Sequence, residues 1–443
     1  MSLRTSIQRR VTSVLTSAKT RDLRRRTLEG ARKIGGSPHR VHYFHQVDDP
    51  YSHLASQLLE PLVERYDIEL HTHLVGPPPD SAAPEREKLV AWSRVDAERV
   101  AEGRGGLSFQ DPGNQPSPDL VARATRILAS TSSSRAFAAL APRVGEAMWD
   151  DDIEALGGMA RDQSGAPNNV ADAIGRGDAL RAKCHHYLGA IFHYAGENYW
   201  GVDRLSHLER RLIHLGASRQ VSAPLLAPRY DVSDERIDAG RLGLTLEVFV
   251  SLRSPYSYIS MPRAFDLATR AGIAMKLRPV LPMVMRGLPV PASKRMYITL
   301  DTKREADAVG MPFGRICDPV GKPVERGFSL YPFAVSKGRA GDYLLSFCRA
   351  VFAEGIDAGT DEGLRHIVEA AGLSWNDAAR NRDIDGWRPE LEANREDMMA
   401  MGLWGVPSFR LSGAGASDFC VWGQDRIWMV EDEIRRRVDT APS

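Results

Sequence analysis

Residues 246–258 read Leu-Glu-Val-Phe-Val-Ser-Leu-Arg-Ser-Pro-Tyr-Ser-Tyr. The first half alternates as a buried strand does, with apolar residues such as Leu246 and Val250 on one face. The second half predicts a helix start, because Ser254 is a good N-cap and Pro255 suits the first helical position. A strand that runs directly into a helix N-terminus presents a hydroxyl and free backbone N–H groups. Such a place favours anions, including a thiolate.

The same pattern occurs earlier in the chain. Residues 41–53 align with residues 246–258 without a gap, at an offset of 205 residues. A second shared element, Trp-Gly-x-Asp-Arg, lies at residues 200–204 and again at residues 422–426. Two matched elements in the same order are hard to obtain by chance, so the sequence predicts an internal duplication with a period far longer than that of a solenoid repeat.

Each half is predicted to contain a strand, a helix and a strand, then a long helical middle, a short strand pair and a closing helix. This order predicts an α/β architecture of two tandem domains, each with an inserted helical subdomain. The expected boundaries are a basic segment at 1–39, a first domain at 40–216, a linker at 217–243 and a second domain at 244–443.

The charge is distributed unevenly along the chain. The formal net charge is only +1, which gives no electrostatic case for binding nucleic acid. Residues 1–36, however, carry ten Lys and Arg against two acids. Apolar residues recur in this segment at helical spacing, namely Leu3, Ile7, Val11, Val14, Leu15 and Ala18. For this amphipathic helix, docking on the protein body or on a partner is favoured over a role as an organellar targeting peptide or contact with a membrane surface.

The four cysteines form neither a Cys-x-x-Cys motif nor a zinc-binding spacing; they are Cys184, Cys317, Cys348 and Cys420. This usage predicts a reducing, cytoplasmic setting without a disulfide framework. The alternating His71 and His73 lack an acidic or cysteine partner at a metal-binding spacing, so no metal site is expected.

Five elements of the second half occur together in one family. They are Ser-Pro-Tyr-Ser-Tyr (254–258), Arg-Pro-Val-Leu (278–281), Lys294 with Tyr297 and Asp301, Gly-Val-Pro (405–407) and Trp-Gly-Gln-Asp-Arg (422–426). With them, residues 244–438 resemble the DsbA-like thioredoxin superfamily, and within it the branch of 2-hydroxychromene-2-carboxylate isomerases and kappa-class glutathione transferases. The resemblance implies two thioredoxin-like domains, since the first half shares the fold outline.

The resemblance also implies a role for each motif residue in binding glutathione. Ser254 would hold the thiolate, Val406 would offer its backbone before a cis Pro407, Gln424 and Asp425 would hold the γ-glutamyl end, and Lys294 would meet the glycyl carboxylate. The first half departs from this pattern, with Asp49 in place of the serine and Gly189-Ala190-Ile191 in place of the proline stretch. It is therefore expected to be a degenerate copy.

The predicted function is a glutathione-dependent isomerase or transferase that acts on a hydrophobic, electrophilic, conjugated small molecule. One alternative is a non-catalytic binding protein on a thioredoxin-like scaffold. A second is a thiol-disulfide oxidoreductase that uses Cys184 or Cys420, although no thiol occupies the Ser254 position. The chain is expected to be either a monomer with an intramolecular domain pair or a homodimer.

Overall fold

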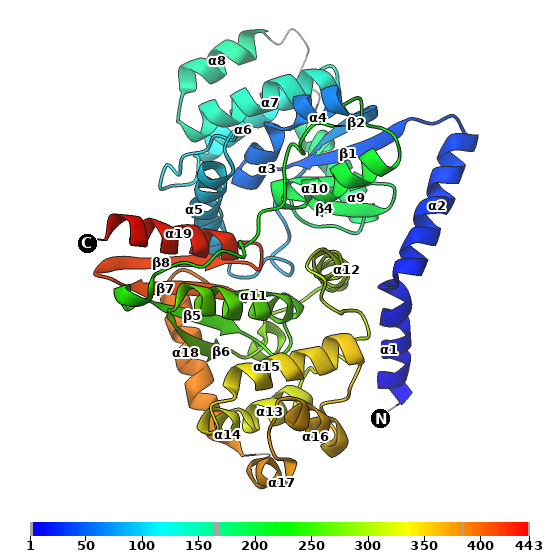
Figure 1. Cartoon of the computed structure of the whole chain (residues 1–443). Coiled ribbons are helices and arrows are strands. Elements are labelled where there is room, and N and C mark those ends of the chain that lie inside the picture. The colour runs from blue at the N-terminus through cyan, green and yellow to red at the C-terminus, as the bar shows by residue number, and fades with distance from the viewer. Residues whose placement is uncertain (1–2, 163–168, 221, 383, 442–443) are drawn as a thin grey trace. The chain divides into compact units, whose positions relative to one another are not determined.

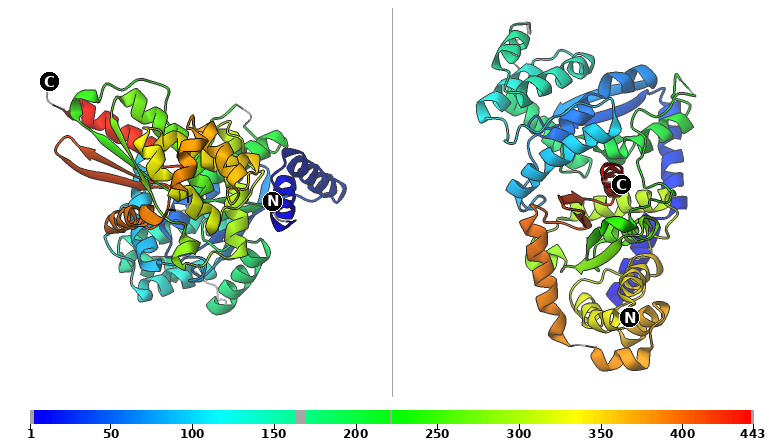
Figure 2. Two further views of the ribbon diagram at one scale, coloured as in Figure 1. Left: turned by 90° about the horizontal axis from the view of Figure 1, so that it is seen from below. Right: turned by 60° about the vertical axis from the view of Figure 1, so that its left-hand side comes forward.

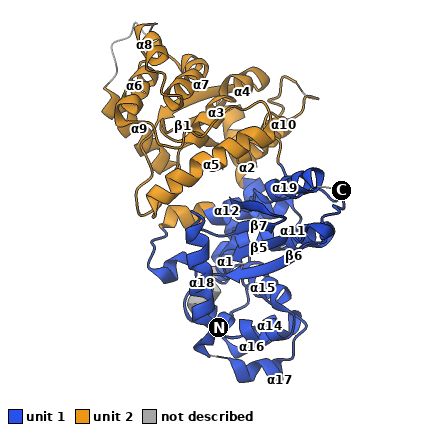
Figure 3. Cartoon of the chain, turned by 90° about the vertical axis from the view of Figure 1, so that its left-hand side faces the viewer, with its two compact units in different colours: residues 1–23, 230–290, 298–443 blue, residues 24–229, 291–297 orange. Residues whose placement is uncertain are grey.

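The computed structural model describes residues 3–162, 169–220, 222–382 and 384–441 (Figures 1 and 2). Its strands form two four-stranded sheets, and each sheet has both parallel and antiparallel neighbours. The chain divides into two compact units (Figure 3). Unit 1 comprises residues 1–23, 230–290 and 298–443, and unit 2 comprises residues 24–229 and 291–297. The predicted α/β fold class is confirmed.

The boundaries of the two units differ from those of the four segments expected from the sequence. Residues 3–23 pack with unit 1, and the expected linker 217–243 is shared between the units. Two helices cross a unit boundary, namely α2 (Ala18–Ile34) and α12 (Ala292–Ala308). Within the expected segments, residues 1–2, 163–168, 221, 383 and 442–443 lie outside the described part of the chain.

The sheet of unit 2 has the strand order β2-β1-β3-β4. Its strands are β1 (His39–His45), β2 (Ile68–Leu74), β3 (Ile191–Tyr194) and β4 (Glu197–Trp200). Its helices are α3 (Pro50–Ser56), α4 (Leu59–Arg65), α5 (Arg86–Arg104), α6 (Pro118–Ala129), α7 (Ser134–Trp149), α8 (Ile153–Asp162), α9 (Val170–Lys183) and α10 (Gly201–His214).

The sheet of unit 1 has the corresponding order β6-β5-β7-β8. Its strands are β5 (Thr245–Val250), β6 (Ala274–Pro279), β7 (Ser408–Gly413) and β8 (Ala416–Trp422). Its helices are α1 (Leu3–Leu15), α11 (Pro255–Ala271), α13 (Lys322–Ser329), α14 (Tyr331–Ser336), α15 (Ala340–Arg349), α16 (Asp361–Ala370), α17 (Trp375–Ala378), α18 (Arg388–Ala400) and α19 (Ile427–Thr440).

The two sheets also share their hydrogen-bond register. Arg40 pairs with Glu69 in unit 2, and Thr245 pairs with Ala274 in unit 1, so both strands of the parallel pair keep the offset of 205 residues. In the antiparallel pair, Ile191 of β3 occupies the ladder position that Ser408 has in β7. Residues 189 and 190 of unit 2 therefore correspond to residues 406 and 407 of unit 1.

The stretch that predicted the fold is built as expected. Leu246, Val248 and Phe249 of β5 are fully buried. α11 follows directly, with Ser254 as its N-cap, and it packs on β5, β6 and α19. The buried strand thus holds the N-terminus of α11 near the carboxyl end of β5, an inner strand of the sheet, where the candidate site lies.

Candidate functional site

Ser254 joins β5 to α11 through local hydrogen bonds. Its backbone is extended, with φ −96° and ψ 110°, and its Oγ accepts a hydrogen bond from the backbone N of Ser257 at 3.1 Å. The Oγ of Ser257 in turn accepts a hydrogen bond from the backbone N of Ser251 at 3.3 Å. Both hydroxyls therefore fix the turn from strand to helix, which is the capping role that the residue types predict.

The second part of the site is the loop before β7. The Val406–Pro407 peptide bond is cis, as the resemblance predicts. The half-buried Ser254 donates its hydroxyl proton to the carbonyl O of Val406 at 3.4 Å. This bond is long for O–H···O, so it is weak and easily replaced by a better acceptor. The structure thus brings Ser254, Val406 and Pro407 together in unit 1.

Gln424 is held in place by other side chains of unit 1. It is only 2% exposed, and its Nε2 donates to Oε2 of Glu305 at 3.0 Å. The guanidinium of Arg263 donates to the backbone O of Gln424 at 2.7 Å and also to its Oε1. Both ends of the side-chain amide are therefore engaged inside the unit.

Asp425 lies in the turn between β8 and α19. Its Oδ1 is 3.6 Å from Nη1 of Arg426, and its backbone O accepts a hydrogen bond from Nε1 of Trp428 at 3.0 Å. The N-cap of α19 is Arg426, so Asp425 does not cap that helix. Its side chain is 18% exposed, which leaves the carboxylate within reach of solvent.

Lys294 belongs to unit 2, whereas Ser254 belongs to unit 1. The Nζ of Lys294 donates to the backbone O of Ala82 at 2.8 Å, and burial lowers the pKa of this amine to about 8. The nearby ring of Tyr297 contacts His186 edge-on, with centroids 4.4 Å apart. Lys294 and Tyr297 are therefore held by residues of unit 2.

A tyrosine–aspartate pair was not singled out from the sequence. The hydroxyl of Tyr256 donates to Oδ2 of Asp301 at 2.8 Å, and Nη1 of Arg304 lies 3.2 Å from Oδ1 of the same carboxylate. In unit 2, Tyr51 donates to Asp96 at 2.7 Å. The two pairs are related by the offset of 205 residues, so this offset could have indicated the pair from the sequence. Because the pair also occurs in the unit without Ser254, it has a structural role.

In unit 2 the position of Ser254 is taken by Asp49, which caps α3. Its Oδ2 accepts hydrogen bonds from the backbone N of Ser52 at 3.1 Å and from the hydroxyl of Ser52 at 2.7 Å. Burial raises the pKa of this carboxyl to about 6. Gly189 packs so closely here that a Cβ on it would lie 2.9 Å from Oδ2 of Asp49. The equivalent of the Ser254 site is therefore filled by the chain itself.

The cysteines give no redox pair in the described part of the chain, where all four are free thiols. Burial raises the pKa of Cys184, and that of Cys317 to about 11, which disfavours their thiolates. Cys420 lies 3.4 Å from the sulfur of Met401. Among the described residues there is also no group of His, Cys, Asp or Glu that could hold a metal ion.

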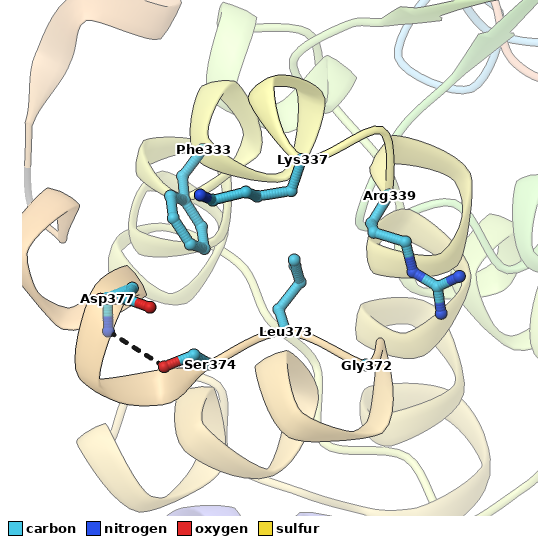
Figure 4. Close-up of a pocket in the computed structure, with 7 residues that line it drawn as sticks. All are labelled: Phe333, Lys337, Arg339, Gly372, Leu373, Ser374 and Asp377. Carbon is cyan, nitrogen blue, oxygen red and sulfur yellow. Dashed lines mark hydrogen bonds between the residues drawn. The ribbon is translucent and has the colours of Figure 1, made fainter.

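A separate open depression of about 570 Å³ lies in the helical part of unit 1 (Figure 4). Its lining residues are Phe333, Lys337, Arg339, Gly372, Leu373, Ser374 and Asp377. None of the predicted site residues lines it, and its charged rim does not suit an apolar substrate.

The chain is similar to known proteins over part of its length. Residues 245–435 match the family described as the DSBA-like thioredoxin domain. A comparison with curated proteins finds no match. Among solved structures, a 2-hydroxychromene-2-carboxylate isomerase is 19% identical over 45% of this chain and 100% of its own length, with a TM-score of 0.37.

Two further structures give similar values. A probable DsbA oxidoreductase from Streptomyces coelicolor is 17% identical over 45% of this chain and 92% of its own, with a TM-score of 0.35. The cytosolic disulfide reductase DsbM from Pseudomonas aeruginosa is 21% identical over 44% of this chain and 99% of its own, with a TM-score of 0.36. Likeness at this level does not carry an activity across to this chain. Residues 245–435, which include the four strands of unit 1, are therefore similar to the DSBA-like thioredoxin domain family.

Proposed function

We propose that unit 1 binds glutathione as a thiolate at Ser254 and uses it on an electrophilic, conjugated organic molecule. The observation that carries this proposal is the weak 3.4 Å bond between the Ser254 hydroxyl and the carbonyl of Val406. This hydroxyl donates toward the loop before β7, while its Oγ accepts the bond from the backbone of Ser257. A bound thiolate would be a better acceptor than the carbonyl.

The helix behind Ser254 supports the same role. α11 is 17 residues long, and its N-terminus carries partial positive charge from the aligned peptide dipoles of the helix. A thiol that meets both this N-terminus and a hydroxyl donor has its pKa lowered, which raises the nucleophilic fraction near neutral pH. Because the chain has no cysteine at this position, the ligand must bring the thiol.

The chemistry then depends on the fate of the carbon–sulfur bond. The thiolate adds to the electrophilic carbon, and the electron pair of the conjugated double bond moves to the carbonyl oxygen. The former double bond is now single and can rotate. In an isomerisation, the enolate returns its electron pair and expels the thiolate, so glutathione is regenerated. In a transfer, the enolate is protonated and the carbon–sulfur bond remains.

Unit 2 lacks the features that carry this proposal. Its capping residue Asp49 is a carboxylate, which repels a thiolate when ionised, and Gly189 covers it. We therefore assign the chemistry to unit 1 alone, with unit 2 kept for its structural role.

A panel of conjugated electrophiles assayed with glutathione tests the proposed function. In Ser254→Ala we expect the thiol-dependent kcat/KM to fall about 10²-fold, the usual loss for one directed donor. The matched control is Thr360→Ala, which removes a side-chain cap from α16 of the same unit. If Ser254→Ala turns over every substrate as fast as Thr360→Ala does, the assignment of Ser254 is wrong.

A further inference from the structure

The N-terminal helix α1 docks on unit 1 through polar side chains. The hydroxyl of Thr16 donates to the backbone O of Gly314 at 3.1 Å, and Thr16 is 5% exposed. One turn earlier, the hydroxyl of Thr12 lies 3.4 Å from both the backbone N and the backbone O of Ile316. Helices on globular proteins usually turn their apolar face toward the core, whereas this helix contacts unit 1 with its polar face.

The apolar side of α1 faces away from unit 1. Val11, Val14 and Leu15 share one face by their spacing, and they are 50%, 59% and 40% exposed. The side chains of Leu3 and Ile7, which the sequence places on the same stripe, lie outside the described part. The next helix, α2, begins in the same unit and adds Leu23, which is 65% exposed. Several exposed apolar residues on consecutive helices mark an interaction surface.

This surface carries concentrated positive charge. The ten Lys and Arg and two acids of residues 1–36 give a net charge of +8, while the whole chain has +1, so the remainder has −7. Both acids are paired within the segment, Asp22 with Arg21 at 3.0 Å and Glu29 with Arg32 at 2.7 Å. Two arginines of the segment also pair with acids outside it, Arg21 with Asp307 at 3.1 Å and Arg25 with Glu197 at 2.6 Å. Arg10, beside the apolar face of α1, is exposed. The segment therefore offers apolar side chains and cations together.

We propose that residues 3–34 bind the surface of an anionic membrane, with the apolar face of α1 at the acyl boundary and the basic side chains at the lipid phosphates. Charge complementarity and exposed apolar residues are the two requirements for an interfacial helix. A second copy of the chain fits less well, since a symmetric contact would place two segments of +8 together. Nucleic acid would use the cations but not the exposed Val and Leu side chains.

This contact is peripheral. Among the described residues, none of the helices is long and apolar enough to cross a bilayer. The sequence favoured docking of this helix on the protein body, and the structure shows the docking but through the polar face. The apolar face is therefore available to the membrane while α1 stays attached to unit 1.

Flotation of the full chain with phosphatidylcholine vesicles, with and without phosphatidylserine, tests the proposal. We expect binding only when phosphatidylserine is present, and weakening as salt is added. Arg10→Glu should lower the affinity more than about fivefold, which corresponds to about 1 kcal/mol for each basic residue near an anionic surface. Val11→Asp combined with Val14→Asp should abolish binding.

The matched control is Val335→Asp in α14, a valine with a similar exposed fraction of 48% outside the segment. It should bind vesicles as the unchanged chain does. Equal binding to both kinds of vesicle, or binding to neither, would overturn the proposal. So would a dimer that Val11→Asp with Val14→Asp dissociates, or tighter binding to DNA than to vesicles.

Discussion

Gly189 lies against Asp49 so closely that a Cβ on residue 189 would stand 2.9 Å from Oδ2 of the carboxylate. The same Cβ would lie 2.7 Å from Cβ of Gln46 and 2.8 Å from Oγ of Ser52. In unit 1 the equivalent residue is Val406, whose carbonyl faces Ser254. The residue at this ladder position therefore differs between the units in how it meets the capping side chain: Gly189 packs tightly on Asp49, whereas Val406 offers its carbonyl to Ser254.

Gly189→Ala should consequently destabilise unit 2. The three neighbours must move to admit the methyl group, and overpacking of this kind costs about 1–3 kcal/mol. Urea unfolding measures the change. The matched control is Gly175→Ala in α9, where a Cβ meets nothing within 4 Å and alanine should stabilise the helix by about 1 kcal/mol. Equal effects of the two variants would contradict the close approach.

The Tyr256–Asp301 pair should contribute to the stability of unit 1. Asp301 is 1% exposed, so Tyr256→Phe removes a partner from a buried carboxylate and should cost about 1.5–3 kcal/mol. Tyr258→Phe is the control, since Tyr258 donates to the neutral carbonyl of Pro312 and should cost only about 1 kcal/mol. If Tyr256→Phe instead has the free energy of unfolding of the unchanged chain but loses thiol-dependent turnover, the pair belongs to the candidate site at Ser254.

Unit 2 should lose stability in acid before unit 1 does. Burial lowers the pKa of His42, His53 and His73 to about 4, and that of His45 and His186 to about 3. A histidine whose pKa is lowered on folding does not reduce the free energy of unfolding of unit 2 above pH 6.5, the ordinary pKa of the side chain. That stability is lost as the pH falls toward 4, because the unfolded state then binds more protons. The raised pKa of Asp49 has the opposite effect on stability, but this single carboxyl is outweighed by the five histidines.

Pulse proteolysis in urea at about pH 7 and about pH 5 measures this difference, with cleavage sites mapped to each unit. Unit 1 serves as the internal reference because its single histidine is His366. In unit 1, Glu247 of β5 occupies the position that His42 has in β1 of unit 2. The buried carboxylate of Glu247 is bound by Arg278 at 2.7 Å and by Arg410. Simultaneous loss of both units at pH 5 would contradict the expectation.

Gln424 should matter for folding more than for ligand binding. Its amide is bonded to Arg263 and Glu305, so Gln424→Ala leaves two charged side chains short of a partner in a buried place. We expect a loss of about 2–4 kcal/mol in the free energy of unfolding. Glutathione affinity of the folded variant should change less than about twofold, well under 1 kcal/mol. A large loss of affinity with unchanged stability would restore the ligand-binding role that the resemblance implies.

The sequence predicted the elements that depend on local physics. The buried strand, Ser254 as N-cap and Pro255 at the first turn are all decided within a dozen residues. The shared offset of 205 residues predicted that the two halves have the same fold outline, and the two sheets share their strand order and the register of their parallel pair. These are properties that neighbouring residues determine among themselves.

The remaining features depend on contacts between distant segments. Gln424 meets partners 161 and 119 residues away along the chain, and Lys294 meets Ala82 across 212 residues. Helical spacing shows that Val11 and Val14 share a face, but it cannot show that this face points outward. Such outcomes depend on which surfaces pack together, which no local pattern encodes.

The ionisation of bound glutathione tests the central claim most directly. The ultraviolet absorbance of the thiolate is followed against pH with the full chain in excess, beside free glutathione as reference. We predict that the bound thiol ionises at least one pH unit below the usual thiol pKa of about 8.5. In Ser254→Ala this difference should shrink, while Thr360→Ala should keep it. A thiol that ionises at the same pH in the presence and absence of the protein, or equally in Ser254→Ala, would contradict the account.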